Sequence, residues 1–445
     1  MSDNKTYASV FDLTGRPKLT QATPLALQHV VAMIVGCVTP AIIVSGVAGL
    51  DGPDKVILIQ AALVVSAIST LLQLFPFIKT GNFQLGSGLP VIMGISFAYV
   101  PSMQAIAENF DIATILGAQI VGGIVAVIVG ILVKKIRPLF PPIITGTVVF
   151  TIGLSLYPTA INYMAGGTSS PTYGSWQNWL VALFTLAVVT VLNHFAKGFL
   201  KLASILIGII AGYIFSAFFG MLNFASVASA GMFQLPQPMH FGVNFEVSSC
   251  IAIGLLFAIN SIQAIGDLSA TTIGSMDREP EDKELQGGII MYGIANIISA
   301  LAGGLPTATY SQNVGIVTTT KVINRCVLGL AAIILLVAGL VPKFSALLTT
   351  IPQCVLGGAT VSVFASIAMT GMKLVMSEEM NYRNTSIVGL AAALGMGISQ
   401  ASASLASFPD WATTIFGKSP VVVATIVAVA LNVILPKEKE QKLQR

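Results

Sequence analysis

Fourteen apolar segments, each close to the length that crosses a lipid bilayer, dominate this sequence. A spanning helix needs roughly 20 apolar residues, and fewer where the span is broken. Only 9% of the residues are charged, against about 25% in a typical soluble domain. The sequence therefore predicts an all-α polytopic membrane protein embedded in a lipid bilayer. The segments cover residues 24–48, 56–77, 88–106, 112–133, 139–160, 179–195, 202–220, 247–267, 287–303, 306–320, 326–341, 352–373, 385–402 and 420–436.

The positive charges support this count of 14 transmembrane segments. If the N-terminus is cytoplasmic, every Lys and Arg of the 22 falls in a cytoplasmic segment except Lys55, Lys343 and Lys418. Cytoplasmic loops collect Lys and Arg, and a miscounted span would have scrambled the segregation. We therefore expect a multi-pass protein of the cell (inner or plasma) membrane, with cytoplasmic tails at 1–23 and 437–445 and no signal peptide.

The remaining composition excludes other classes of protein. A net charge of +4 gives no reason to expect binding to nucleic acid. The four cysteines lie in apolar stretches without paired spacing, so neither disulfides nor a zinc site are predicted. The spans hold no cluster of nucleophiles, carboxylates or metal ligands, so we expect no enzyme activity, no metal and no cofactor.

Two landmarks recur at nearly the same distance along the chain. The sequence Gly-Leu-Pro occurs at 88–90 and 304–306, offset by 216, and 141–146 is echoed by 352–357, offset by 211. A duplicated unit of seven spans would insert its second copy upside down, which gives a 7+7 inverted repeat. Paired Gly/Pro-interrupted spans in such repeats point to a binding site near the midplane. The alternative is that Gly and Pro are simply common in transmembrane helices.

Five polar side chains within or at the ends of spans are the candidates for function: His29, Gln263, Asp267, Gln312 and Asn313. Each ionisable group costs at least a few kcal/mol at the bilayer centre. Gln263 and Asp267 are four residues apart and share a helix face. Alternatively, Asp267 caps or pairs near the cytoplasmic end, and His29 bonds a neighbouring helix. The amide of Gln312 can close a two-bond ring with a neutral heterocycle such as a nucleobase.

The segment Gln-Asn-Val-Gly at 312–315, followed by Thr320 and Lys321, resembles the tenth-span signature of the nucleobase/ascorbate transporter family. This family includes xanthine, urate and uracil permeases. Similarity continues at 28–29, 86–99, 140–146, 266–267 and 351–358, so it covers nearly the whole chain.

The resemblance implies a fold with a core domain (24–133 and 247–341), a gate domain (139–220 and 352–436), and short extended pieces in spans 3 and 10. It also implies a homodimer and proton symport. Of the residues, Ser96, Phe97 and Ala98 would supply backbone contacts and a stacking ring. Gln312 would hold the edge of the base, and Asn313 and His29 would support it.

Two positions depart from the family pattern. Gln263 stands where members usually have glutamate, and Tyr292 stands where xanthine members often have aspartate. Proton coupling would then rest on Asp267 or His29. Xanthine and urate members of the family usually have glutamine at the position of Gln312, so the resemblance implies import of xanthine or uric acid, bound by Gln263 and Gln312. The alternatives are a uracil or other nucleobase permease, or an anion transporter of the sulfate type with the same architecture.

Overall fold

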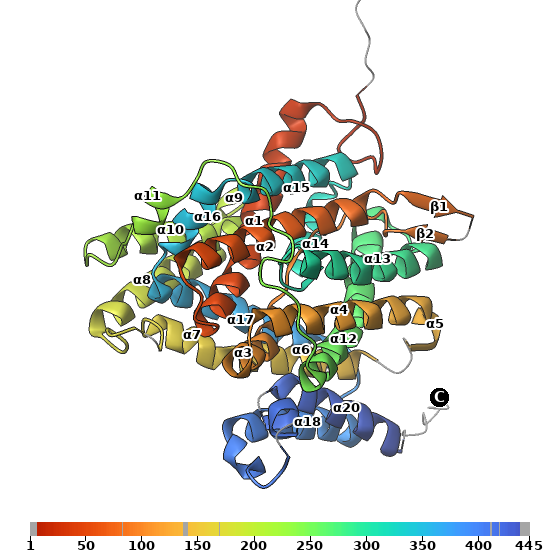
Figure 1. Cartoon of the computed structure of the whole chain (residues 1–445). Coiled ribbons are helices and arrows are strands. Elements are labelled where there is room, and N and C mark those ends of the chain that lie inside the picture. Colours follow the sequence, from red (N-terminus) through yellow and green to blue (C-terminus); the bar gives the residue numbers. More distant parts are fainter. Residues whose placement is uncertain are drawn as a thin grey trace, which may run out of the picture.

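The computed structural model describes residues 7–81, 83–136, 141–168, 170–409, 412–417 and 419–436. The predicted C-terminal tail at 437–445, the first six residues and the predicted start of the gate domain at 139–140 lie outside the described residues. Most long helices run alongside one another across the view of Figure 1. The β1–β2 hairpin (Ile78–Thr80 and Phe83–Leu85) lies at one end of this bundle, and α11 (Ala225–Ser229) lies at the other.

Helices account for most of the described chain, and many are long and apolar, which confirms a polytopic membrane protein. Within the described ranges, eight helices are long and apolar enough to cross a membrane, or nine if the bent pair α15 (Arg325–Gly339) and α16 (Pro342–Thr349) counts as one span. The eight are α1 (Leu19–Val47), α2 (Gly52–Leu74), α4 (Ile112–Ile131), α6 with α7 (Pro142–Ser155 and Tyr157–Met164), α8 (Trp176–Phe195), α12 (Val247–Met276), α13 (Asp282–Leu301) and α17 (Gln353–Val375).

Shorter or more polar helices occupy other predicted spans. These are α10 (Ser204–Ala217), α18 (Tyr382–Gln400) and α20 (Pro420–Ile434). Several helices begin where a polar side chain accepts a hydrogen bond from a free backbone N–H of the first turn. Asp51 does so for α2, Asp111 for α4 and Ser175 for α8. The sequence thus marks the beginnings of apolar helices with capping residues.

The third and tenth predicted spans are broken, and their extended pieces pair with each other. Span 3 consists of β3 (Met93–Ile95), the 3₁₀ turn η1 (Phe97–Tyr99) and α3 (Val100–Asn109), and span 10 consists of β4 (Thr307–Thr309) and α14 (Ser311–Thr320). The strands are antiparallel, with Gly94 opposite Ala308. Backbone at membrane depth must be hydrogen bonded within the protein, and this pairing provides the partners. The expected extended pieces are therefore present.

The helices pack in two groups. In the first, called the α4 group, α4 contacts α12 and α13, while α15 contacts α1 and α2. In the second, called the α17 group, α17 contacts α6, α7, α8 and α10, while α18 packs on α20 and α6. Contacts between the groups, such as α12 with α6 and with α20, are sparser. The broken spans 3 and 10 belong to the α4 group.

The predicted end of the eighth span at residue 267 is wrong. Helix α12 continues to Met276, so Asp267 lies inside it. The polar residues that suggested an end are compatible with a helix, because Thr271 and Thr272 donate their hydroxyl protons to carbonyls of the preceding turn, at 2.8 and 3.2 Å. Such internal bonds satisfy hydroxyl groups within a membrane helix.

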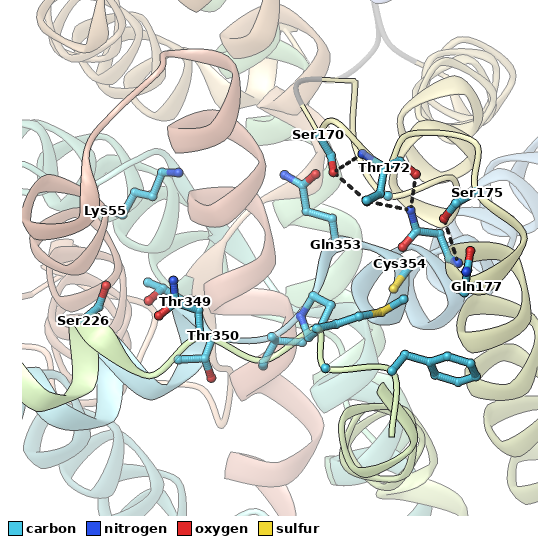
Figure 2. Close-up of a pocket in the computed structure, with 18 of the residues that line it drawn as sticks. Lys55, Ser170, Thr172, Ser175, Gln177, Ser226, Thr349, Thr350, Gln353 and Cys354 are labelled. Carbon is cyan, nitrogen blue, oxygen red and sulfur yellow. Dashed lines mark hydrogen bonds between the residues drawn. The ribbon is translucent and has the colours of Figure 1, made fainter. Parts of the chain in front are cut away.

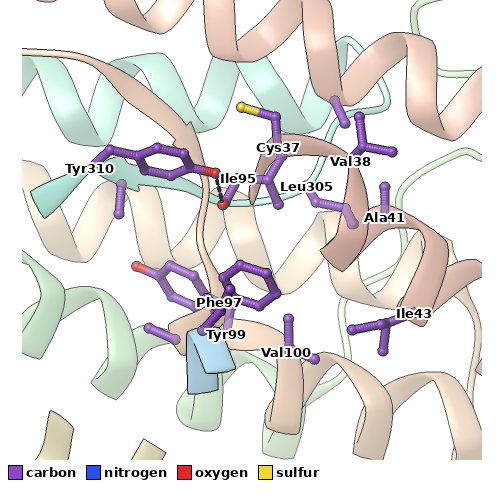
Figure 3. Packing of buried hydrophobic residues seen from close by; sticks show 14 of the residues in the cluster. Cys37, Val38, Ala41, Ile43, Ile95, Phe97, Tyr99, Val100, Leu305 and Tyr310 are labelled. Atoms are coloured by element: carbon purple, nitrogen blue, oxygen red, sulfur yellow. Dashed lines mark hydrogen bonds between the residues drawn. The ribbon is translucent and has the colours of Figure 1, made fainter. Parts of the chain in front are cut away.

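Close packing around the paired strands leads to a stability prediction. A Cβ atom on Gly94 would lie 2.6 Å from Cζ of Tyr310 and 2.8 Å from Sγ of Cys37. Figure 3 shows Tyr310 and Cys37 packed here, with the Tyr310 hydroxyl donating a hydrogen bond to the Ile95 carbonyl at 2.6 Å. We expect Gly94→Ala to lower the free energy of unfolding by about 1–3 kcal/mol through overpacking. Thermal unfolding in detergent measures the loss.

Gly389→Ala is the matched control for this prediction. Gly389 lies in α18, and a Cβ atom there has nothing within 4 Å. Because Ala is a better helix former than Gly, this change should leave the midpoint unchanged or raise it slightly. Equal midpoints for the two variants would contradict the packing argument.

Candidate functional site

A cavity of about 260 Å³, here called the central cavity, opens where the two broken spans meet. Its walls come from spans 3 and 10 and α12 of the α4 group, and from α6 and α17 of the α17 group. The volume is close to the lower end of the roughly 300–1,000 Å³ range of small-molecule sites, which suits a small ligand. The lining residues are Ser96, Phe97, Ala98, Val149, Ile152, Gln263, Thr309, Tyr310, Ser311, Gln312, Ser366, Ile367 and Thr370.

Five of the predicted site residues line this one cavity: Ser96, Phe97, Ala98, Gln263 and Gln312. Neither glutamine amide is hydrogen bonded to another group in the described part of the chain, so both are available to a ligand. Each amide offers two N–H donors and a carbonyl acceptor. The Phe97 ring lies edge-on to Phe364 of α17, with 5.3 Å between ring centroids. The cavity therefore combines amides with an aromatic surface.

Two half-helices start at the cavity. The Ser96 hydroxyl oxygen accepts a hydrogen bond from the Ala98 N–H at 3.2 Å and caps the turn that leads into α3. Helix α14 starts at Ser311, directly after β4. The N-terminus of a helix carries free N–H groups and a partial positive charge. The cavity wall thus favours carbonyl oxygens or a negative charge on a ligand.

Asp267 lies one layer behind the cavity wall. Its carboxylate is buried and accepts hydrogen bonds from the hydroxyls of Thr309 and Ser311, the latter at 2.8 Å. Both hydroxyl residues line the cavity. Asp267 therefore does not cap a helix end, and it connects α12 to the second broken span. Gln263, one turn earlier on the same face, reaches the cavity itself, as the four-residue spacing indicated.

Asn313 and His29 lie away from the cavity lining and contact each other. The Asn313 amide nitrogen is 3.0 Å from His29 Nδ1 and donates to the His29 carbonyl at 3.2 Å. Both side chains are buried, and the Asn313 carbonyl oxygen has no partner among the described residues. This pair joins α1 to α14. His29 therefore bonds a neighbouring helix, as the alternative interpretation of this residue predicted. Gln312 lines the central cavity, whereas the neighbouring Asn313 does not.

Tyr292, which stands where xanthine members of the family often have aspartate, is part of a buried aromatic cluster. The Tyr292 hydroxyl is hydrogen bonded to that of Tyr99, and the Phe257 ring lies 4.8 Å from Tyr99 and 5.5 Å from Tyr292 between centroids. Tyr292 is not among the residues lining the central cavity. At this position the chain has a packing contact, and at Gln263 it has an uncharged amide facing the cavity.

Sequence reasoning missed the residues on the α17 group's side of the cavity and the two hydroxyls that bond Asp267. Thr309 and Ser311 shortly precede Gln312 in the sequence, and this proximity was a usable signal. Ser366 and Thr370 offer no such signal, because each donates its hydroxyl proton to a carbonyl of its own helix, at 2.9 and 2.8 Å. Such residues occur throughout membrane helices.

Solved transporters share the fold. The transmembrane domain of the bicarbonate transporter BicA from a cyanobacterium superposes with a TM-score of 0.59 at 19% identity, covering 93% of this chain and 98% of that one. SLC26A9 superposes with a TM-score of 0.60 at 10% identity, covering 94% of this chain and 65% of that one. At these identities the likeness concerns the fold alone.

Relatives found by sequence have higher identities to this chain than these solved structures. The chain is 35% identical over 427 residues to the uric acid permease PucJ of Bacillus subtilis, covering 94% of this chain and 93% of that protein. It is 31% identical over 442 residues to the xanthine permease XanQ of Escherichia coli, covering 96% and 94%. The model of the family described as "Permease family" matches residues 20–404. The chain belongs to this family of permeases, the nucleobase/ascorbate transporters.

Proposed function

We propose that this protein imports a purine nucleobase, xanthine or uric acid, by proton symport. One observation carries the proposal: Gln263 and Gln312, from two different helices, present unpaired amides to one small cavity. Oxidised purines carry alternating C=O and N–H groups on their edges, and amides match such edges. The relatives named above, permeases for uric acid and xanthine, support the same substrate class.

In the proposed complex, Gln312 holds one edge of the base and Gln263 holds another. The backbone N–H groups of Ser96 and Ala98 are hydrogen bonded within the protein, so the N–H of Phe97 between them faces a carbonyl oxygen of the base. The Phe97 ring packs on the face of the base. Asp267 takes up the proton, and Ser311 relays its protonation state to the cavity wall. Gln263 itself has no titratable proton. Asp267 is the carboxylate that is hydrogen bonded to residues of the cavity wall, Thr309 and Ser311.

The proposed architecture has fourteen spans in two inverted halves, with both termini cytoplasmic, and a homodimer in the cell membrane. The α4 group corresponds to the core domain and the α17 group to the gate domain. The sparser contacts between these groups support this division, as does a cavity lined by both. Relative movement of two nearly rigid groups would expose the cavity to each side in turn.

An anion transporter is the second candidate, and the two half-helix N-termini at the cavity favour it. A simple inorganic anion, however, can accept hydrogen bonds from the amide N–H groups but has no N–H to donate to the two amide carbonyl oxygens. A site whose amides must hydrogen bond the ligand also discriminates against ligands that leave them unpaired.

Uptake into cells that lack their own purine carriers tests the proposal. We expect labelled xanthine or uric acid to accumulate, a protonophore to abolish accumulation, and neither uracil nor sulfate to compete. Preferred uptake of uracil would move the function to pyrimidines, and inhibition by sulfate would favour the anion transporter. Accumulation that persists with the protonophore would remove proton coupling from the proposal.

A further inference from the structure

Two further polar cavities lie where the predicted topology places the outer face. The larger, here called the vestibule, has a volume of about 660 Å³. Its walls come from four stretches near 52–55, 166–178, 219–226 and 349–354, all at or beside predicted outer loops. Figure 2 shows Lys55, Gln353 and a series of Ser and Thr side chains around it. A polar hollow of this size at the outer face is accessible to solutes in water.

The smaller cavity, here called the outer chamber, has a volume of about 310 Å³. It shares Gln353 with the vestibule, so this side chain borders both cavities. Its polar lining residues include Gln104, Glu108, Thr159, Asn162, Tyr163 and Gln353. With about 310 Å³ against about 260 Å³, the outer chamber is larger than the central cavity, and three of its lining residues carry amides.

The outer chamber lies between the central cavity and the outer end of the bundle, along two of the same chain segments. In span 3, Ala98 lines the central cavity and Gln104 lines the outer chamber. In α6 and α7, Ile152 lines the central cavity and Thr159 lines the outer chamber. Six or seven helical residues correspond to about 9–10 Å. The two helix groups that enclose the central cavity thus also enclose the outer chamber.

The outer chamber holds a buried polar atom without a partner. The Tyr163 side chain is only 7% exposed, and its hydroxyl forms no hydrogen bond with any described residue. The Gln353 amide comes close to the same spot, because a Cβ atom on Gly46 would lie 3.5 Å from the Tyr163 hydroxyl and 3.7 Å from Gln353 Nε2. A buried hydroxyl without a partner is costly unless a ligand or water meets it. The absence of a side chain at Gly46 keeps this space open.

We propose that the outer chamber is a second binding site for the transported heterocycle, occupied on its way from the vestibule to the central cavity. The hydroxyl of Tyr163 and the amide of Gln353 donate hydrogen bonds to ring carbonyl oxygens. The amide oxygens of Gln104 and Asn162 accept one hydrogen bond each, from Thr159 and Tyr173, and their second lone pairs accept from ring N–H groups. This inference rests on the proposed function for the class of solute. The ligand is a planar heterocycle with neighbouring C=O and N–H groups.

A thiol placed at Thr168, an exposed residue that lines the outer chamber, tests occupancy directly in the full-length protein in cells. We combine Thr168→Cys with Cys354→Ala, because Cys354 borders the vestibule. A membrane-impermeant maleimide is added from outside, with and without excess uric acid or xanthine. The same experiment is repeated with Gln312→Ala, which removes an amide of the central cavity. We expect the purine to slow labelling at least fivefold in both backgrounds.

Each outcome of the labelling experiment either supports or overturns a purine site in the outer chamber. Protection that survives Gln312→Ala places the purine in the outer chamber. Protection that disappears with Gln312→Ala overturns the inference, because labelling then only reports the state of the central cavity. Labelling without any protection, or no labelling from outside, overturns it as well. If the unsubstituted protein takes up no purine at all, the proposed function fails instead, and the uptake assay shows this separately.

Tyr163→Phe gives a second measurement that does not depend on the added thiol. This change removes only the unpartnered hydroxyl, so folding should be unaffected. We expect KM for uptake to rise about tenfold, with kcat and thermal stability unchanged. Tyr382→Phe is the matched control, because Tyr382 is 88% exposed and lies outside the outer chamber. An unchanged KM for Tyr163→Phe would exclude the hydroxyl from the site.

Discussion

Replacing Asp267 with Asn should abolish proton-driven accumulation of the purine while exchange of labelled for unlabelled solute continues. Asn keeps the size of the side chain and can still contact the hydroxyls of Thr309 and Ser311 that now donate to the carboxylate. It cannot bind and release a proton. Binding at the cavity wall should therefore survive, while the energetic link to the proton gradient is lost.

The expected size of this effect follows from linkage. One proton carried with each solute molecule allows about tenfold accumulation for each unit of pH difference, because one pH unit corresponds to about 1.4 kcal/mol. In proteoliposomes with an imposed pH gradient, the unsubstituted protein should reach such ratios. The Asp267→Asn variant should approach a ratio of about one, that is, equal concentrations on both sides.

Asp277→Asn is the matched control, because it removes a carboxylate next to the same helix without touching the cavity. Asp277 follows α12 in a left-handed conformation, and its side chain is 86% exposed. Asn accepts this backbone conformation as readily as Asp does. Full gradient-driven accumulation by Asp267→Asn would exclude this carboxylate as the coupling group and direct attention to His29.

The parts of the site that could be predicted from sequence are those whose chemistry is unusual for a membrane helix. Gly-Leu-Pro followed by polar residues breaks a span, and the structure has β3 and β4 there, paired with each other. A carboxylate and an amide four residues apart must share a face. Gln263 lines the central cavity, and Asp267 is hydrogen bonded to Thr309 and Ser311 of the second broken span. These inferences needed only local geometry and the cost of burying polar groups.

The contributions of ordinary residues could not be predicted. Ser366 and Thr370 line the cavity, yet their hydroxyls bond their own helix as they would anywhere in a membrane. The contact of His29 with Asn313 joins residues 284 positions apart, and no pattern within either segment encodes it. The end of α12 was missed for a related reason, since hydroxyl residues that bond the helix backbone resemble a loop in composition.

The second large effect is expected for Gln312→Leu, which should lower kcat/KM for purine uptake by about 5- to 150-fold. Leu keeps a similar volume and removes both the donors and the acceptor of the amide. A group on the purine edge that is left unpaired in the cavity costs about 1–3 kcal/mol, which corresponds to that range of rates. Initial rates of uptake over a range of purine concentrations measure the change.

Ser366→Ala distinguishes loss of a hydrogen-bonding partner from a general disturbance of the cavity. Ser366 lines the same cavity from α17, but its hydroxyl proton already bonds the Ser362 carbonyl. Removing it should change kcat/KM less than twofold if ligand recognition depends on amides free of internal partners. Equal losses for both variants would mean that the shape of the cavity, and not the pairing of its amides, selects the solute. Because Gln312 has no internal partner to lose, its replacement should leave the unfolding temperature unchanged, so a drop in uptake would report recognition alone.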